Sequence, residues 1–312
     1  MGRGRHRRCN PSQRHKDGKR PYRVQALPVK TIKEDLRRRD FTINSVAFDI
    51  RNEKIVDPFN GLKDLKMGII KATDKRTFVE DPLRLMRAVQ FASRFEFGVE
   101  KNTKYLMSSN AQGLREITGE RILDELHKIT SKKGNTEIAF DLIDETDIDL
   151  ALFGSKLRHN HLGQLDDLSF FYVLCKNGSV NPDRFYKDRL RGDRDFTKEL
   201  EVLDKVMKID LENIAEEELR FEIFNAIKRA PRFTRSHLLN PRVDDIVSKM
   251  RKNQIPSKMA DIAIDGNVIE EKLGIEGKKI GQVLDLVKRD SLMGRVDWRD
   301  TDKLLAHIEM FK

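Results

Sequence analysis

From residue 76 onward, apolar residues recur at the three- and four-residue spacing of an amphipathic helix, and this periodicity most limits the fold. In DPLRLMRAVQFASRF (81–95) the apolar positions include Leu83, Met86 and Val89, and Pro82 suits the first helical position. GERILDELHKITSK (119–132) repeats the pattern, and similar segments follow to the end of the chain. The sequence therefore predicts a mostly α-helical protein.

A short β segment precedes these helices. The stretches INSVAFDI and KIVDPF alternate or cluster apolar residues on either side of the polar turn RNEK. We therefore predict a β-hairpin over residues 43–57. Pro58, Asn60 and Gly61 then supply the chemistry of a turn.

The charge balance favours a polyanionic partner such as nucleic acid. Lys and Arg number 61 against 51 acidic residues, a formal net charge of +10, although residues 1–20 hold much of the excess. No stretch approaches the ~18 apolar residues that span a bilayer, so we expect no membrane association. The two cysteines, Cys9 and Cys175, allow one disulfide, but we expect a reduced, cytoplasmic protein.

In the stretch EDLRRRDFTINSVAFD (34–49), three consecutive arginines directly precede an aspartate, and an alternating strand begins after it. The forked donors of Arg38 and Arg39 can bridge phosphate oxygens, and the carboxylate of Asp40 can accept a hydrogen bond from a ribose hydroxyl. An exposed basic turn with an Arg–Asp pair is the alternative, and this stretch by itself favours it. The neighbouring motifs shift the balance toward a nucleotide site.

A second polar group lies on the predicted helix 81–95. Asp81, Arg84 and Arg87 occupy every third position, so they form one ridge that drifts slowly around the helix. A carboxylate and a guanidinium in fixed relation can present an acceptor and donors to the edge of a base. Alternatively, Asp81 caps the helix ahead of Pro82, and both roles are compatible because a capping carboxylate is held rigidly.

Four stretches of the chain, taken in order, resemble the motifs of a known family. They lie between residues 31 and 130 and read DLRRRDFTINSVAFD, VDPFNGLKDLKMGIIKAT, FVEDPLRLMRAVQFASRFEFGV and ITGERILDELHKI. The family they resemble is the class II tRNA nucleotidyltransferases, the CCA-adding enzymes, which share a superfamily with bacterial poly(A) polymerases. Near the C-terminus, MADIAIDGNVIEEKLGIEGKKIGQVLDLV is similar to the tail domain of such enzymes.

The resemblance implies a short β remnant of a nucleotidyltransferase head, followed by an α-helical neck, body and tail. The implied segments are a basic, disordered N-terminal segment (1–29), a partial head with the hairpin (30–75), a neck with the templating helix (76–130), a helical body (131–250) and a helical, tRNA-binding tail (251–312).

The resemblance also implies a role for each candidate residue. The implied nucleotide-binding residues are Arg38, Arg39, Asp40, Asp81, Arg84 and Arg87. In the family, the arginine of the first motif contacts the phosphates, its aspartate reads the 2′-hydroxyl, and the Asp–Arg pair of the helix selects C or A as a protein template. Gly61 is the implied hinge, and Glu120 and Arg121 are candidates to support the templating helix. The family usually continues the ridge with another arginine where this chain has Gln90, so we expect a triphosphate contact there to be weakened or lost.

The implied activity is the addition of C and A to tRNA 3′ ends, with ATP and CTP as substrates, Mg²⁺ as the metal and tRNA as the partner. A poly(A) polymerase of the same superfamily is an alternative, although the tail-like C-terminus favours the CCA-adding activity. A third possibility is a non-catalytic RNA-binding remnant, or one half of a split enzyme.

The carboxylates that perform this chemistry are missing from the expected place. Nucleotidyl transfer uses two metal ions, which the family holds with two carboxylates one residue apart, ahead of the Arg–Asp motif. Residues 1–36 contain no such pair, since Asp17, Glu34 and Asp35 lack the spacing, and residues 1–15 have no counterpart in the resemblance. We therefore predict no catalytic or metal-binding residue here, a truncated head, no activity for the chain alone, and a separately encoded head half as a further partner.

Two other stretches are weaker candidates. RHNHLGQLDD (158–167) offers His159 and His161 near two aspartates, but a solvated polar turn explains it better than a metal site. DRFYKDRLRGDRDF (183–196) interleaves aromatic residues with arginines, which is typical both of an RNA-binding surface and of a charged helix.

Overall fold

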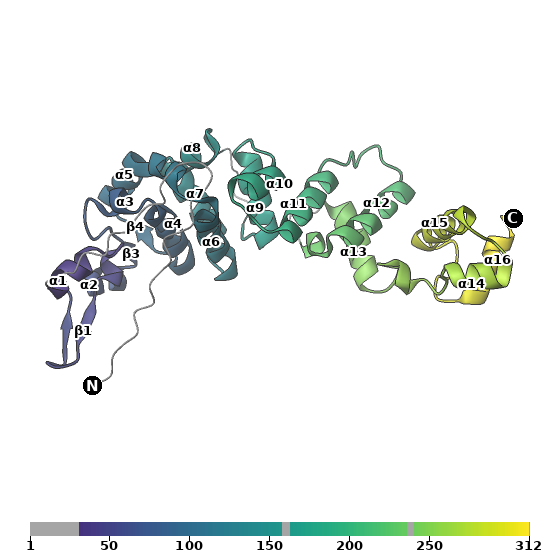
Figure 1. Cartoon of the computed structure of the whole chain (residues 1–312), viewed down its shortest axis with the longest axis horizontal. Helices are drawn as coiled ribbons and strands as arrows, with labels where there is room; N and C mark the ends of the chain where they lie inside the picture. Colours follow the sequence, from purple (N-terminus) through teal and green to yellow (C-terminus); the bar gives the residue numbers. More distant parts are fainter. Residues whose placement is uncertain (1–30, 158–162, 236–239, 312) are drawn as a thin grey trace, which may run out of the picture.

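Helices make up most of the structure, which confirms the predicted mostly α fold class. The computed structural model describes residues 31–157, 163–235 and 240–311. The predicted basic segment 1–29 and the histidines His159 and His161 lie outside these residues. The helices follow one another along an elongated molecule, with the β structure close to the N-terminal end and α14, α15 and α16 at the other (Figure 1).

The β structure is limited to two small pairs of strands. Strands β1 (Ala47–Asp49) and β2 (Lys54–Val56) form an antiparallel hairpin, so the hairpin prediction is confirmed, within narrower bounds than 43–57. Strands β3 (Ile69–Ile70) and β4 (Gly98–Val99) pair in parallel, which the sequence did not predict. Because β4 follows the helix that carries the polar ridge, this short pair ties the C-terminal end of that helix back to residues 69–70.

Residues 42–44 form a turn of 3-10 helix rather than the start of the predicted strand. The Ser45 hydroxyl donates to the Phe41 carbonyl at 2.9 Å, which favours a turn over a strand. The helical elements of this N-terminal part are α1 (Ile32–Arg37), η1 (Thr42–Asn44) and α2 (Gly61–Met67).

The next segment is a bundle of helices centred on α4, which packs against both α6 and α7. Its elements are α3 (Thr77–Glu80), α4 (Leu83–Phe95), α5 (Lys101–Asn110), η2 (Ala111–Glu116), α6 (Gly119–Ser131), α7 (Thr136–Glu145) and α8 (Ile148–Phe153). The apolar stripe of α6 lies in the core, where Ile122, Leu126 and Ile129 are fully buried, as the sequence period predicts.

Side-chain caps start most of the helices that follow, because aspartate and asparagine oxygens accept from the unpaired first-turn amides. These elements are α9 (Asp167–Asn177), α10 (Pro182–Arg184), η3 (Phe185–Arg189), α11 (Arg194–Val206), α12 (Glu216–Arg229), η4 (Pro231–Arg235), α13 (Pro241–Arg251), η5 (Met259–Asp261), α14 (Gly266–Leu273), α15 (Lys278–Met293) and α16 (Thr301–Glu309).

The aromatic residues of the stretch 183–196 belong to the core. Phe185, Tyr186 and Phe196 are buried, and the Tyr186 hydroxyl donates to Asp193 at 3.1 Å. Burial raises the pKa of Tyr186, and the nearby Asp193 carboxylate raises it further. These rings are therefore not available to stack on RNA bases.

Two apolar clusters stabilise the described chain. The larger one extends from Phe41 to Ile255 and includes Leu292, and the smaller one lies between Ile262 and Ile308. The smaller cluster falls within the predicted tail, while the larger one continues through the predicted head, neck and body, so the division into these segments stays a prediction. Within the described residues, no helix is long and apolar enough to cross a membrane.

Candidate functional site

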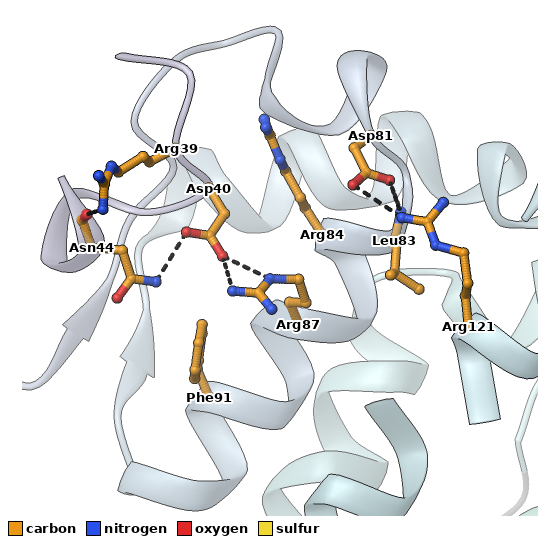
Figure 2. A pocket seen from close by; sticks show the side chains of 9 residues that line it. All are labelled: Arg39, Asp40, Asn44, Asp81, Leu83, Arg84, Arg87, Phe91 and Arg121. Atoms are coloured by element: carbon orange, nitrogen blue, oxygen red, sulfur yellow. Dashed lines mark hydrogen bonds and ion pairs between the residues drawn. The ribbon is translucent and has the colours of Figure 1, made fainter. Parts of the chain in front are cut away.

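A polar pocket of about 560 Å³ lies where the N-terminal part meets α4. Figure 2 shows its lining, which comes from the loop after α1, from η1, from α4 and the segment that leads into it, and from the start of α6. The lining residues are Arg39, Asp40, Asn44, Asp81, Leu83, Arg84, Arg87, Phe91 and Arg121. The structure thus brings together five of the six predicted nucleotide-binding residues, and adds the predicted support residue Arg121.

Asp40 is held rigidly at one side of the pocket. One of its carboxylate oxygens accepts from the Phe41 amide and from the Asn44 side-chain amide, each at 2.9 Å. The Phe41 ring is buried and packs edge-on against Phe91 of α4, with ring centroids 5.9 Å apart. The local turn and this aromatic contact together fix the carboxylate relative to α4.

Arg87 of α4 binds the other oxygen of Asp40. Its Nε donates at 2.8 Å and its Nη2 lies at 2.7 Å, so the guanidinium engages the carboxylate with two nitrogens (Figure 2). The Arg87 guanidinium also lies over the Phe91 ring, 5.1 Å from its centroid. This ion pair joins residues 47 positions apart in the sequence and links the first predicted motif to the templating helix.

Arg84 is positioned by main-chain carbonyls. Its Nη2 donates to the Arg38 carbonyl at 2.6 Å and its Nη1 to the Thr77 carbonyl at 3.1 Å. A guanidinium carries more N–H groups than these two bonds use, so Arg84 keeps donors for a ligand in the pocket. Its side chain is only 17% exposed, which limits its freedom to move.

Asp81 takes the capping role, one of the two roles that the sequence left open. Its carboxylate accepts from the Leu83 amide at 3.2 Å, which caps the start of α4, and both of its oxygens lie 3.4 Å from Nη2 of Arg121. Arg121 comes from α6, so a second helix orients the carboxylate. The structure therefore places Arg121 where the resemblance implies a supporting residue.

The two arginines that precede Asp40 differ in position. Arg39 lines the pocket, and its Nη1 donates to the Asn44 carbonyl at 3.2 Å. Arg38 lies outside the lining, and its side chain pairs with Asp35 at 2.6 Å. The hydrogen bond from Arg38 lowers the pKa of Asp35. Arg39 is therefore better placed than Arg38 to contact a phosphate group.

The second candidate support residue, Glu120, is placed differently from Arg121. It is exposed in the first turn of α6, and no hydrogen bond or ion pair joins it to another residue of the described chain. One turn further along, Glu125 is only 3% exposed and lies 4.0 Å from Arg87. Sequence reasoning missed Glu125, although its position between the apolar residues Leu123 and Leu126 is a signal of burial.

Gln90 shows where the polar ridge ends. Steps of three residues fall about 60° short of a full turn, so successive positions rotate around the helix. Gln90 is buried at 3% exposure, whereas Phe91 continues the lining after Arg87. The pocket lining therefore continues from Arg87 to Phe91, four positions later, and the side chain of Gln90 faces the core.

Gly61 has a packing reason to be glycine. A Cβ at this position would lie 2.0 Å from the Thr42 carbonyl oxygen, so α2 approaches η1 too closely for any side chain. The amide of Gly61 is also bound to the Asp57 carboxylate at 2.7 Å. The hinge role stays a prediction.

The pocket lining carries four arginines and two aspartates, which suits an anionic ligand such as a nucleotide. In the part of the chain that the structure describes, no group of three or more His, Cys, Asp or Glu residues is arranged to hold a metal ion.

Comparisons with known proteins find two matching family models. A model of the poly A polymerase head domain matches residues 5–71, and a model of the probable RNA and SrmB-binding site of polymerase A matches residues 96–153. The first match begins at residue 5, within residues 1–15, for which the motif resemblance offered no counterpart.

Related proteins cover most of the chain. The CCA-adding enzyme of Lactobacillus helveticus is 29% identical over 299 residues, which are 91% of this chain and 73% of that one. The structure of the Thermotoga maritima CCA-adding enzyme complexed with tRNA matches with a TM-score of 0.69 at 25% identity, over 90% of this chain and 74% of that one. A structure of a CCA-adding enzyme with ATP matches with a TM-score of 0.66 at 25% identity, over 89% and 71% of the two chains.

The head-domain match, the RNA-binding match and an arginine-rich pocket between them define the class of RNA nucleotidyltransferases. Within it, the comparisons support the class II family of CCA-adding enzymes and bacterial poly(A) polymerases. The resemblance of the four sequence motifs is thereby confirmed.

Proposed function

We propose that this protein is a tRNA nucleotidyltransferase of the CCA-adding type, and that the pocket selects the incoming nucleotide. The observation that carries the proposal is the convergence of Arg39, Asp40, Asp81, Arg84 and Arg87 on one pocket. Two segments far apart in the sequence supply these residues, and the motifs of the two segments taken together predict a nucleotide site.

The base edges explain why an aspartate and an arginine suit C and A. Cytosine and adenine each present an exocyclic amine beside a ring nitrogen, which is a donor beside an acceptor. The Asp81 carboxylate accepts and the Arg84 guanidinium donates, so the pair complements this order. Guanine and uracil present a carbonyl beside a ring N–H, which reverses the order and leaves both protein groups mismatched.

The remaining lining residues suit the other parts of a nucleotide. Arg39 supplies a guanidinium for a phosphate group, and Asp40 is the acceptor for the ribose 2′-hydroxyl. Magnesium, when bound, would stabilise the charge of the triphosphate and of the attacking hydroxyl. In our proposal, the residues that line the pocket bind and orient the nucleotide.

The choice of tRNA as the RNA partner is supported by the Thermotoga maritima complex and by the RNA-binding match. A poly(A) polymerase activity is the second candidate, since the matching head domain takes its name from that enzyme. The thiol of Cys175 is buried and forms no disulfide among the described residues, and we propose that the protein is cytoplasmic.

Nucleotide binding by the whole chain tests the proposal without requiring catalysis. Equilibrium dialysis with each labelled nucleoside triphosphate should show binding of CTP and ATP, and binding of GTP and UTP weaker by at least about tenfold. Binding of ATP alone would favour the poly(A) polymerase. Equal binding of all four nucleotides would overturn base selection by this pocket.

Extension of tRNA that lacks its terminal CCA tests the second half of the proposal. The chain is incubated with Mg²⁺, CTP and ATP, once alone and once with the head fragment of a CCA-adding enzyme. From the sequence we expect no extension by the chain alone and addition of C and A when the fragment is present. Extension by the chain alone would show that its own residues hold the metal ions.

A further inference from the structure

Glu125 of α6 is a buried carboxylate with unused bonding capacity. It is 3% exposed, and its Oε1 accepts from Lys128 at 2.8 Å. Its Oε2 is buried and has no hydrogen-bond partner among the described residues. A buried charged oxygen without a partner costs free energy, so such an atom calls for a functional explanation.

Arg87 lies near the Glu125 carboxylate. Its Nη1 is 4.0 Å from Glu125 Oε1, while its Nε and Nη2 are both engaged with Asp40. The guanidinium therefore stands between two buried carboxylates, one on the N-terminal part and one on α6. A charge-assisted hydrogen bond is about 2.8 Å long, so a movement of roughly 1 Å would bring Nη1 onto Glu125.

The Asp40 carboxylate, in contrast, has no acceptor position left for another donor. Its two oxygens already accept from the Phe41 amide, the Asn44 amide and two nitrogens of Arg87. A carboxylate offers about four acceptor positions, so a ribose hydroxyl can bind Asp40 only when one of these donors leaves. Arg87 is the donor that has another carboxylate within reach.

We propose that Glu125 is a positioning residue that withdraws Arg87 from Asp40 when a ribonucleotide enters, so that Asp40 can bind the 2′-hydroxyl. The inference rests on the proposed function, because it takes Asp40 as the residue that reads the ribose. Two arrangements of Arg87 then exist, on Asp40 or on Glu125, and a ribonucleotide favours the second by its extra hydrogen bond.

This scheme makes discrimination between ribose and deoxyribose depend on a residue that does not line the pocket. The measured quantity is the ratio of the dissociation constants for dCTP and CTP, obtained by calorimetry on the whole chain. We expect CTP to bind at least about tenfold more tightly than dCTP, because a hydrogen bond to a charged group is lost with the hydroxyl.

Three substitutions test the role of Glu125. Glu125→Gln removes the charge that attracts Arg87, so the ratio should fall toward one. Lys128→Met removes the competing cation, so Arg87 should move to Glu125 more readily and the ratio should rise. Asp124→Asn is the matched control, since this acid lies on the same helix but is exposed, and the ratio should not change.

The outcomes separate this inference from the proposed function. A wild-type ratio in Glu125→Gln, or an unchanged or lower ratio in Lys128→Met, would overturn the inference while base selection stands. If Glu125→Gln fails to fold, as thermal melting would show, Lys128→Met still decides the question. If Asp40→Asn keeps the wild-type ratio, Asp40 does not read the ribose and the inference fails with that assignment. A wild-type chain that binds CTP and GTP equally well would overturn the proposed function itself.

Discussion

Two acidic residues are buried to nearly the same extent but are bonded differently. Glu125 lies behind the pocket and is 3% exposed, and Asp290 lies in the C-terminal unit (residues 262–308) and is 4% exposed. Both oxygens of Asp290 are satisfied, one by Arg295 at 2.9 Å and the other by His307 at 2.7 Å. Glu125 has one satisfied oxygen and one without a partner among the described residues. The comparison suggests that a fully bonded buried acid stabilises the fold, whereas a partly bonded one is available for function.

The pocket and the C-terminal unit also differ in how each of them is built. The pocket is built from charged side chains that meet across distant segments, as Asp40 and Arg87 do. The C-terminal unit is built around its own apolar cluster between Ile262 and Ile308. Substitutions in the C-terminal unit should therefore change stability more than nucleotide binding, and substitutions in the pocket should do the reverse.

The largest expected effect comes from Leu304→Ala in α16. Leu304 is fully buried in the smaller cluster, and truncating a buried leucine to alanine typically costs about 2–5 kcal/mol. Thermal melting should show earlier unfolding of the C-terminal unit, while the dissociation constant for CTP should stay the same. Met310→Ala, which truncates a side chain that is 80% exposed, is the control and should leave both quantities unchanged. Loss of CTP binding in Leu304→Ala would show that the two regions are coupled.

A second prediction compares the two buried acids directly. Asp290→Asn should lower the free energy of unfolding by about 1–3 kcal/mol, because His307 and Arg295 lose the charge they bind. Glu125→Gln should lower it by less than about 1 kcal/mol, because the one cation hydrogen-bonded to Glu125 is the half-exposed Lys128. Denaturant titration of both variants measures the difference. Equal losses of unfolding free energy in the two variants would mean that the hydrogen bonds of the buried oxygens do not set the contribution of each acid to stability.

The preference for C and A over G and U should fall by about tenfold or more in Asp81→Ala and in Arg84→Ala. Each substitution leaves a group of the base unpaired, at a cost of ~1–3 kcal/mol. The measurement is binding of CTP and ATP against GTP and UTP, or misincorporation of G and U once a head fragment is supplied. tRNA affinity should change less than base choice. If Asp81→Ala keeps the full preference for C and A, Asp81 serves as a helix cap and the templating assignment fails.

Two arginine variants serve as controls for that experiment, because the phosphates are common to all nucleotides. Arg39→Ala should weaken every nucleotide alike, since Arg39 lines the pocket. Arg38→Ala should also act on all nucleotides alike, but more weakly, since its side chain is paired with Asp35 outside the lining. A base-dependent effect of Arg39→Ala would contradict its assignment to phosphate.

The smallest expected effect is the pH dependence of the C-terminal unit. Burial raises the pKa of Asp290, but the hydrogen bonds from His307 and Arg295 outweigh it and lower the pKa overall. A carboxyl group with a lowered folded pKa stabilises the protein above its unfolded pKa of about 3.9, and this contribution is lost as the pH falls through the folded value. Melting temperatures between about pH 5 and pH 2 should fall more steeply in the wild type than in Asp290→Asn. Parallel curves would show that Asp290 does not contribute.

Features that depend on local geometry could be predicted from the sequence. The helical period placed α4 and α6 correctly, because apolar spacing along one helix is a local property. The hairpin followed from alternation around a polar turn. The parallel pair of β3 and β4 could not be predicted, since two-residue strands carry no period and their pairing depends on how α4 is packed.

By itself, the sequence determined the helical array, the family motifs and which residues are candidates for the nucleotide site. The tertiary structure alone decided which of those candidates touch. It paired Asp40 with Arg87, bound Arg84 to main-chain carbonyls and left Arg38 outside the pocket. It also brought Glu125, which the motifs did not single out, beside Arg87. The physical reason is that spacing along a helix follows from the residue number, whereas contact between residues of different elements depends on the packing of the whole core.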